Sequence, residues 1–154
     1  RWWRFLGRPQ THRFLLVAGL AGAVILSLVG SAAIYDGWLE DRRIDRAAGE
    51  FLVAHTAPGD IVMSDDPSAV WQVSGRAGVP MPFDPYPVVE DVIRAYDVRW
   101  VVVARRDGAA MDPLGLWEGA EATDGTGHAA TFLESDPIFE TSGVRIYRVV
   151  GSAR

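Results

Sequence analysis

The sequence contains no cysteine and no lysine among its 154 residues. The lack of cysteine excludes disulfide bonds, thiolate metal ligands and cysteine nucleophiles, and it leaves the redox compartment undetermined. The use of arginine without lysine suggests a bacterial genome rich in G and C. Because the chain begins at Arg1 and not at a methionine, we expect it to be a segment of a longer protein.

Acidic residues are absent from the first 13 positions, which hold four of the 15 arginines. The other 11 arginines share the rest of the chain with 20 acidic residues. A surface that follows nucleic-acid phosphates needs clustered positive charge, so we expect no nucleic-acid partner. The part that follows the apolar run described next has about 115 residues, which is enough for one soluble domain.

No charged residue occurs between Phe14 and Tyr35, a run of 22 residues. At the α-helical rise this run spans about 33 Å, which matches the ~30 Å hydrocarbon core of a bilayer. Arginines precede the run, whereas Asp36, Glu40 and Asp41 follow it. The positive-inside rule therefore predicts a plasma-membrane protein with its N-terminus in the cytoplasm and its C-terminal domain outside.

These features divide the chain into a basic cytoplasmic leader (1–13), a transmembrane helix (14–36) and an extracytoplasmic domain (37–154). A cleaved signal peptide is the alternative, since Ser31-Ala32-Ala33 resembles a cleavage site, but the apolar core of such peptides is only about 7–15 residues long. Small residues every four positions allow another helix to pack closely. Besides membrane lipid, we therefore expect helices of the same parent chain or a second copy as partners, on the face of Gly19, Ala23, Ser27 and Ser31.

Hydrophobic spacing and turn residues predict the elements of the outer domain. In its first half we predict a break at Gly37, an amphipathic helix over 44–55, a buried strand over 61–64, a helix that Asp66 caps and Gly75 ends, and an edge strand or none over 79–83. In its second half we predict a helix that opens at Pro87, a strand over 100–104, a loop over 105–127, a short helix over 128–135, and a hairpin of 138–141 and 144–150 around Ser142-Gly143.

The strongest strand signal is Trp100–Ala104, which shows no polar alternation. Such a strand is covered on both faces, as is typical of a central parallel strand under helices. The order of elements predicts an α/β fold, in which one N-terminal transmembrane helix precedes a small α/β sandwich with a mixed sheet and a C-terminal β-hairpin.

No sequence motif of a catalytic class occurs: there is no nucleophile elbow, P-loop, H-E-x-x-H motif or dinucleotide-binding glycine pattern. The histidines His12, His55 and His128 share no metal-ligand spacing with one another or with a carboxylate, so we expect polar surface or helix-end positions for them. We therefore assign no catalytic residue, no metal site and no cofactor to this chain.

Four residues are candidates for substrate contact. Asp65 and Asp66 follow the first predicted strand at its carboxyl end, where ligands of open α/β sheets bind, and could hold sugar hydroxyls or a cation. An N-cap role for Asp66 and a solvated loop position for Asp65 are the simpler interpretations. Arg76 and Tyr86 could line a cleft, although covering a loop is the simpler role for both.

The order of the sequence segments resembles that found in a known protein family. The apolar helix is followed by RAAGEFL (46–52), APGD (57–60), IVMSD (61–65), VSGR (73–76), PMP (80–82), VIRAYDVRWVVV (92–103) and VRIYRV (144–149). This order is similar to the C-terminal end of bacterial polytopic glycosyltransferases of the C-type superfold, such as protein mannosyltransferases and aminoarabinose transferases. The resemblance covers nearly the whole chain from Phe14 and includes no catalytic motif.

The resemblance implies an accessory, acceptor-side domain of an enzyme that transfers a sugar from a polyprenyl-phosphate donor to an extracytoplasmic acceptor in the cell envelope. The catalytic carboxylate of that family lies in an early extracytoplasmic loop, which this sequence does not contain, and a divalent metal could assist the parent enzyme. The domain would then cap the membrane site, help to select the acceptor or stabilise the fold. The alternative is a single-pass, membrane-anchored extracytoplasmic module with a binding or assembly role and no enzymatic activity.

Overall fold

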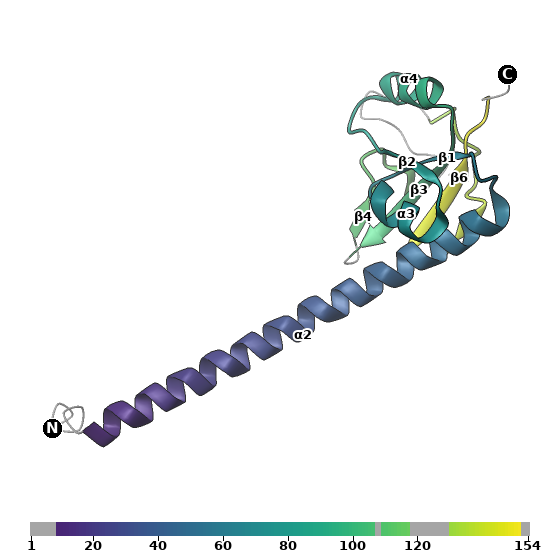
Figure 1. Ribbon diagram of the computed structural model, residues 1–154. Helices are drawn as coiled ribbons and strands as arrows, with labels where there is room; N and C mark the ends of the chain where they lie inside the picture. Colours follow the sequence, from purple (N-terminus) through teal and green to yellow (C-terminus); the bar gives the residue numbers. More distant parts are fainter. Residues whose placement is uncertain (1–8, 107–108, 118–129, 152–154) are drawn as a thin grey trace. The chain divides into compact units, whose positions relative to one another are not determined.

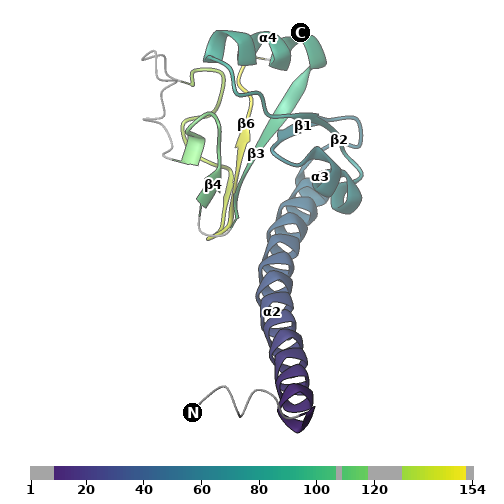
Figure 2. The same cartoon turned by 90° about the vertical axis from the view of Figure 1, so that its left-hand side faces the viewer.

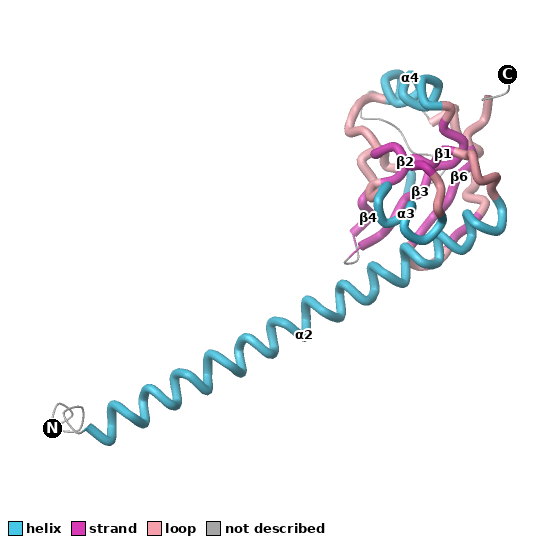
Figure 3. The backbone as a smooth tube through the Cα atoms, in the orientation of Figure 1, coloured by secondary structure: helices cyan, strands magenta, loops and turns pink. Residues whose placement is uncertain are grey.

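The structure, a computed structural model, describes residues 9–106, 109–117 and 130–151. The chain divides into two units, Arg1–Leu39 and Glu40–Arg154, and the helix α2 (Pro9–His55) contributes to both (Figure 1). In Figure 3, the chain can be followed from this helix, in cyan, into the strands of the domain, in magenta. The predicted fold class, a long apolar N-terminal helix before an α/β domain that ends in strands, is confirmed.

In the first unit, α2 contains the apolar run. Its large apolar side chains are exposed, with Leu26 at 77% and Ile34 at 76%. The helix is long and apolar enough to cross a membrane, and none of its most apolar 18-residue window is buried. Within the described residues it is the one helix with these properties. A helix that is apolar on every side is typical of a membrane span or of the core of a large protein.

The predicted break at Gly37 is wrong, because α2 continues through this residue to His55. A glycine inside a helix costs only about 1 kcal/mol relative to alanine, which the turns on either side outweigh. The helix predicted over 44–55 is the last part of α2. Its apolar residues Ile44, Ala48, Phe51 and Leu52 are buried, as an amphipathic helix requires.

The remaining elements are β1 (Ile61–Ser64), α3 (Pro67–Ser74), β2 (Ala77–Pro80), α4 (Tyr86–Tyr96), β3 (Val98–Arg106), β4 (Ala109–Met111), β5 (Phe139–Glu140) and β6 (Val144–Arg148). The strands form a six-stranded mixed sheet in the order β2-β1-β3-β6-β5, and β4 pairs with the end of β3. Strand β1 is parallel to β2 and β3, whereas β6 is antiparallel to β3 and β5.

Strand β3 lies in the middle of the sheet and is buried on both faces. Val101 and Val103 belong to the core that α4 covers, and Trp100, Val102 and Ala104 belong to the core that α2 and α3 cover. Figure 2 shows α4 and α3 on different sides of the strands. The expected coverage of both faces is confirmed, but β3 is parallel only to β1, because the C-terminal hairpin places β6 antiparallel on its other side.

Local signals at β1 and α3 predicted these elements correctly. The strand over 61–64 is β1, with three of its four residues buried. Helix α3 begins at Pro67 behind the N-cap Asp66 and ends at Gly75, whose φ of 66° lies in the left-handed region that glycine tolerates best. Of the two outcomes left open for 79–83, an edge strand or none, the structure has an edge strand, but β2 covers Ala77–Pro80 and residues 81–83 are not part of it.

The helix predicted over 128–135 is wrong in its described part, Ala130–Ser135, which contains turns and an isolated bridge from Leu133 to Val149. Here the backbone pairs with the chain around the end of β6: the Val150 N–H donates to the Phe132 carbonyl, and the Glu134 N–H donates to the Arg148 carbonyl. These bonds replace the local ones that a helix would need. His128 and Ala129 lie outside the described residues.

The segment predicted as a loop, 105–127, begins with the end of β3 and then forms β4, which pairs back on β3. Leu114 and Leu116 are buried in the core under α4. Residues 109–117 are therefore held to the domain by strand pairing, by these two apolar side chains, and by the Tyr86 and Tyr147 hydroxyls, which donate to the carbonyls of Leu114 and Leu116. Residues 107–108 and 118–127 lie outside the described residues.

The predicted C-terminal hairpin is present, with the two-residue link Ser142-Gly143 closed by a 2.9 Å hydrogen bond from the Thr141 N–H to the Val144 carbonyl. Gly143 is needed for close packing. A Cβ atom there would lie 2.6 Å from Cγ1 of Ile44 on α2. The hairpin and the last turns of α2 can therefore approach only because this position has no side chain.

Candidate functional site

The carboxyl end of β1, where the sequence places Asp65, is occupied by an ion-pair cluster. Asp65 Oδ2 lies 3.1 Å from Nε of Arg106, at the end of β3. The same guanidinium contacts two carboxylates of α2, Asp45 at 2.7 Å and Asp41 at 3.7 Å. The side chains of Arg106 and Asp65 are only 17% and 11% exposed. Asp65 is thus held by an arginine and is not a solvated loop acid.

Opposing effects set the charge state of Arg106. Partial burial disfavours its charged form, but the hydrogen bond and the negative charge of Asp45, together with those of Asp65, raise its pKa above the ordinary value. The guanidinium is therefore a permanent cation that joins the ends of β1 and β3 to α2. This arrangement provides a structural link, and its carboxylates are already engaged.

Asp66 has the capping role that its sequence context predicts. Its Oδ1 accepts a 3.0 Å hydrogen bond from the Ala69 N–H, and this backbone hydrogen bond lowers the pKa of the Asp66 carboxyl. Ser64, just before the two aspartates, is fully buried, and its Oγ has no hydrogen-bond partner in the described structure. A serine nucleophile needs a base within hydrogen-bond reach, so Ser64 does not have the environment of one.

Arg76 and Tyr86 are both buried and hold neighbouring segments. Arg76 donates from Nε to Thr56 Oγ1 at 2.8 Å and from Nη2 to the Thr56 carbonyl at 2.9 Å, which satisfies acceptors at the C-terminal end of α2. The Tyr86 hydroxyl donates to the Leu114 carbonyl at 2.5 Å. No described contact connects either residue to Asp65 or Asp66, and substrate contact by these four residues stays a prediction.

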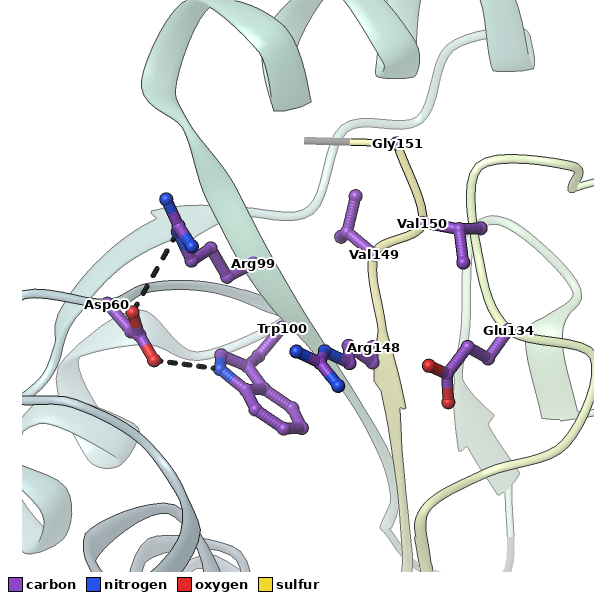
Figure 4. Close-up of a pocket in the computed structure, with 8 residues that line it drawn as sticks. All are labelled: Asp60, Arg99, Trp100, Glu134, Arg148, Val149, Val150 and Gly151. Carbon is purple, nitrogen blue, oxygen red and sulfur yellow. Dashed lines mark hydrogen bonds and ion pairs between the residues drawn. The ribbon is translucent and has the colours of Figure 1, made fainter. Parts of the chain in front are cut away.

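A pocket of about 340 Å³ lies at the beginning of β3 and the end of β6 (Figure 4). It is lined by Asp60, Arg99, Trp100, Glu134, Arg148 and residues 149–151. Sequence reasoning did not identify this pocket, because its walls come from segments that are far apart in the chain. The charged residues at the ends of β3 and β6 were the available signal.

One wall of the pocket consists of a closed polar network. Asp60 Oδ2 accepts hydrogen bonds from Trp100 Nε1 at 3.1 Å and from the Ala57 N–H at 3.0 Å, and its other oxygen lies 3.9 Å from Arg99 Nε. Arg99 also pairs with Asp97 at 3.3 Å. The charges on this wall are therefore engaged within the protein, and the indole of Trp100 is held by its N–H.

The other two charged side chains of the pocket, Arg148 and Glu134, have no polar partner within the described residues. Figure 4 shows the Arg148 side chain beside the Trp100 ring. The guanidinium Cζ lies 5.9 Å from the ring centroid. Within the described residues, neither the Arg148 guanidinium nor the Glu134 carboxylate has a hydrogen bond or an ion pair. The pocket thus presents an arginine with open donors and a carboxylate with open acceptors to solvent.

The described part of the chain was compared with what a metal site and a functional histidine require. It contains no group of three or more His, Cys, Asp or Glu side chains that could hold a metal ion. His55 has a helix-end role, since its Nδ1 lies 2.9 Å from the Phe51 carbonyl and its ring stacks on Phe51 at 4.2 Å. The side chain of His12, and all of His128, lie outside the described structure.

No protein-family model, no curated protein and no solved structure matches the chain. The fold and the site define a small α/β domain that follows one helix able to span a membrane, with one mixed-charge pocket described above.

Proposed function

We propose that this chain is the accessory, acceptor-side part of a membrane glycosyltransferase that transfers a sugar from a polyprenyl-phosphate donor to an acceptor outside the cytoplasm. In this proposal α2 is a transmembrane helix of the parent enzyme. The observation that supports it most is that α2 continues from its exposed apolar run into buried positions of the α/β domain with no non-helical linker. This helical continuity supports an origin of the domain and of the proposed span in one membrane protein.

The distribution of polar groups agrees with an accessory role. Sugar transfer needs a positioned carboxylate, often with a metal, to activate the acceptor or stabilise the leaving phosphate. Asp65 is bound to Arg106, and Asp66 caps α3. The catalytic carboxylate would therefore come from another part of the parent protein, and the transfer would take place near the lipid phosphate.

A topology experiment tests the membrane arrangement. Alkaline phosphatase fused after Arg154 should be active in bacteria, and a green fluorescent protein fused at the same point should be dark, because the arginines before the apolar run should stay in the cytoplasm. An inactive phosphatase together with a bright fluorescent fusion would contradict this orientation.

An activity experiment tests the enzymatic proposal. The DNA upstream of the Arg1 codon is read first, and the protein encoded by the whole frame is purified beside this chain in detergent. Radiolabelled polyprenyl-phosphate sugars are offered to both. The whole protein should release label from the lipid and this chain alone should not. Turnover by this chain that is lost on Asp65→Asn or Asp66→Asn would place a catalytic site in the domain and refute the proposal.

The second candidate is an anchored binding module without enzymatic activity, and the open charges of Arg148 and Glu134 in the pocket favour it. The upstream DNA distinguishes the two functions. Several further apolar spans in the same reading frame would support the transferase. A start codon directly before Arg1 would support the single-pass module.

A further inference from the structure

The pocket at the ends of β3 and β6 contains one positive and one negative side chain that have no hydrogen bond or ion pair within the described residues. Arg148 and Glu134 line the same space of about 340 Å³. A backbone hydrogen bond of 3.0 Å, from the Glu134 N–H to the Arg148 carbonyl, ties the two residues together. Their charged groups nevertheless form no ion pair with each other or with another described residue.

We infer that this pocket binds a small zwitterion, a molecule with a carboxylate or phosphate group and a protonated amine. The anionic group would accept hydrogen bonds from the Arg148 guanidinium, whose planar fork suits bidentate binding of carboxylate and phosphate. The protonated amine would donate to the Glu134 carboxylate. This inference does not depend on the sugar-transfer proposal.

The charge balance of the pocket favours a zwitterion over a simple anion or a simple cation. On one wall, Arg99 pairs with Asp60 at 3.9 Å and with Asp97 at 3.3 Å, so these charges are engaged within the protein. Arg148 and Glu134 therefore leave one charge of each sign without a partner. A simple anion would meet the negative charge of Glu134, and a simple cation would meet Arg148, whereas a zwitterion satisfies both groups.

The Trp100 side of the pocket is ordered before any ligand binds, and the exposed Arg148 side chain contacts it. Trp100 is 8% exposed, and its N–H donates to Asp60, so its ring does not turn freely. The Arg148 guanidinium rests on that ring, a contact with cation–π character. A donor group held in this way loses less freedom when it binds an anion, which improves affinity.

The test follows the Trp100 indole N–H by nuclear magnetic resonance in the full chain, labelled with nitrogen-15 and kept in detergent micelles. The peak is assigned by its absence in Trp100→Phe. The zwitterionic probes are β-alanine, which carries a carboxylate, and O-phosphoethanolamine, which carries a phosphate. Acetate and inorganic phosphate are the anion-only probes, and ethanolamine is the cation-only probe.

The expected result is that at least one zwitterion shifts the Trp100 peak with a Kd about tenfold or more below that of its single-charge counterparts, because it gains a second charge-assisted hydrogen bond. The carboxylate and phosphate probes then show which anionic group the pocket prefers. Arg148→Gln and Glu134→Gln should each weaken binding by about tenfold or more. Arg94→Gln, which changes an exposed arginine on α4, is the matched control and should leave Kd unchanged.

Three outcomes would overturn the inference. The first is no shift of the Trp100 peak up to about 10 mM probe, well above the ~1 mM Kd of a weak complex. The second is equal affinity for the zwitterion and its anion-only counterpart with no effect of Glu134→Gln. The third is equal weakening by the Arg94→Gln control. Glu134→Gln removes no contact described within the protein, so a loss of binding in this variant with unchanged thermal melting cannot be ascribed to unfolding.

Discussion

Arg106 is surrounded by three carboxylates, and Arg106→Met should destabilise the α/β domain strongly. Methionine keeps most of the apolar stem of arginine but removes the charge. The guanidinium makes two close contacts, at 2.7 Å to Asp45 and 3.1 Å to Asp65, and a longer one of 3.7 Å to Asp41. Each close contact is a charge-assisted hydrogen bond between side chains that are less than a fifth exposed.

A charge-assisted hydrogen bond contributes about 1.5–3 kcal/mol, so the two close contacts together predict a loss of about 3–6 kcal/mol. The loss includes the cost of leaving partly buried carboxylates without a cation. For a domain of this size, such a loss should lower Tm by about 10–20 °C. Tryptophan fluorescence of the full chain in detergent follows the melting. Arg43→Gln breaks only an exposed 3.2 Å pair with Glu40 and should change stability by less than about 0.5 kcal/mol.

A double-mutant cycle isolates the electrostatic cause. Asp45→Asn should destabilise the wild-type domain, because it removes a partner of Arg106. In the Arg106→Met background the same change should raise stability, because it removes a carboxylate that has lost its cation. An Arg106→Met protein that melts like wild type, or an Asp45→Asn effect of the same sign in both backgrounds, would refute this account of the cluster.

Three further variants test the fold by urea unfolding, followed by tryptophan fluorescence. Val102→Asp places a carboxylate at a β3 position that is 2% exposed and should cost several kcal/mol; unchanged stability would show that the strand is not central. Asp66→Ala should cost about 1 kcal/mol through loss of the Ala69 cap. The cap lowers the pKa of Asp66, so its contribution should be complete above the ordinary pKa of 3.8 and should be lost as pH falls through the lowered pKa of the folded state; an equal acid response in the variant would contradict this. Gly143→Ala should cost about 1–3 kcal/mol, since the new methyl group meets Ile44, and a wild-type midpoint would show that the hairpin can move away from α2.

Elements whose ends are set by interactions between residues close together in the sequence were predictable. Asp66 caps α3 through a hydrogen bond to a residue three positions away, and Gly75 ends the helix through its own backbone conformation. The break at Gly37 and the described part, 130–135, of the helix predicted over 128–135 were wrong for the opposite reason. The free-energy cost of one glycine in a helix is small compared with the stability of the helical turns on either side of it. The backbone groups of Phe132 and Glu134 form hydrogen bonds with residues far away in the sequence and not with their neighbours.

The candidate sites depended on contacts across the chain. Asp65 was identified by its place after a strand, but its partner Arg106 lies 41 residues away, and Asp45 lies 61 residues from the same arginine. In the pocket, Trp100 and Asp60 are 40 residues apart. Nothing in the spacing of these residues indicates that they meet.

The sequence by itself determined that one helix is apolar enough to cross a membrane and that an α/β domain with a C-terminal hairpin follows it. These properties depend on consecutive residues, through composition, hydrophobic period and turn chemistry. Only the tertiary structure decided which charges are paired and which remain open in the pocket. The physical reason is that β3 pairs with β1 on one side and with β6 on the other, each in one register. This register decides which charged side chains lie close enough to pair and which face the pocket without a partner.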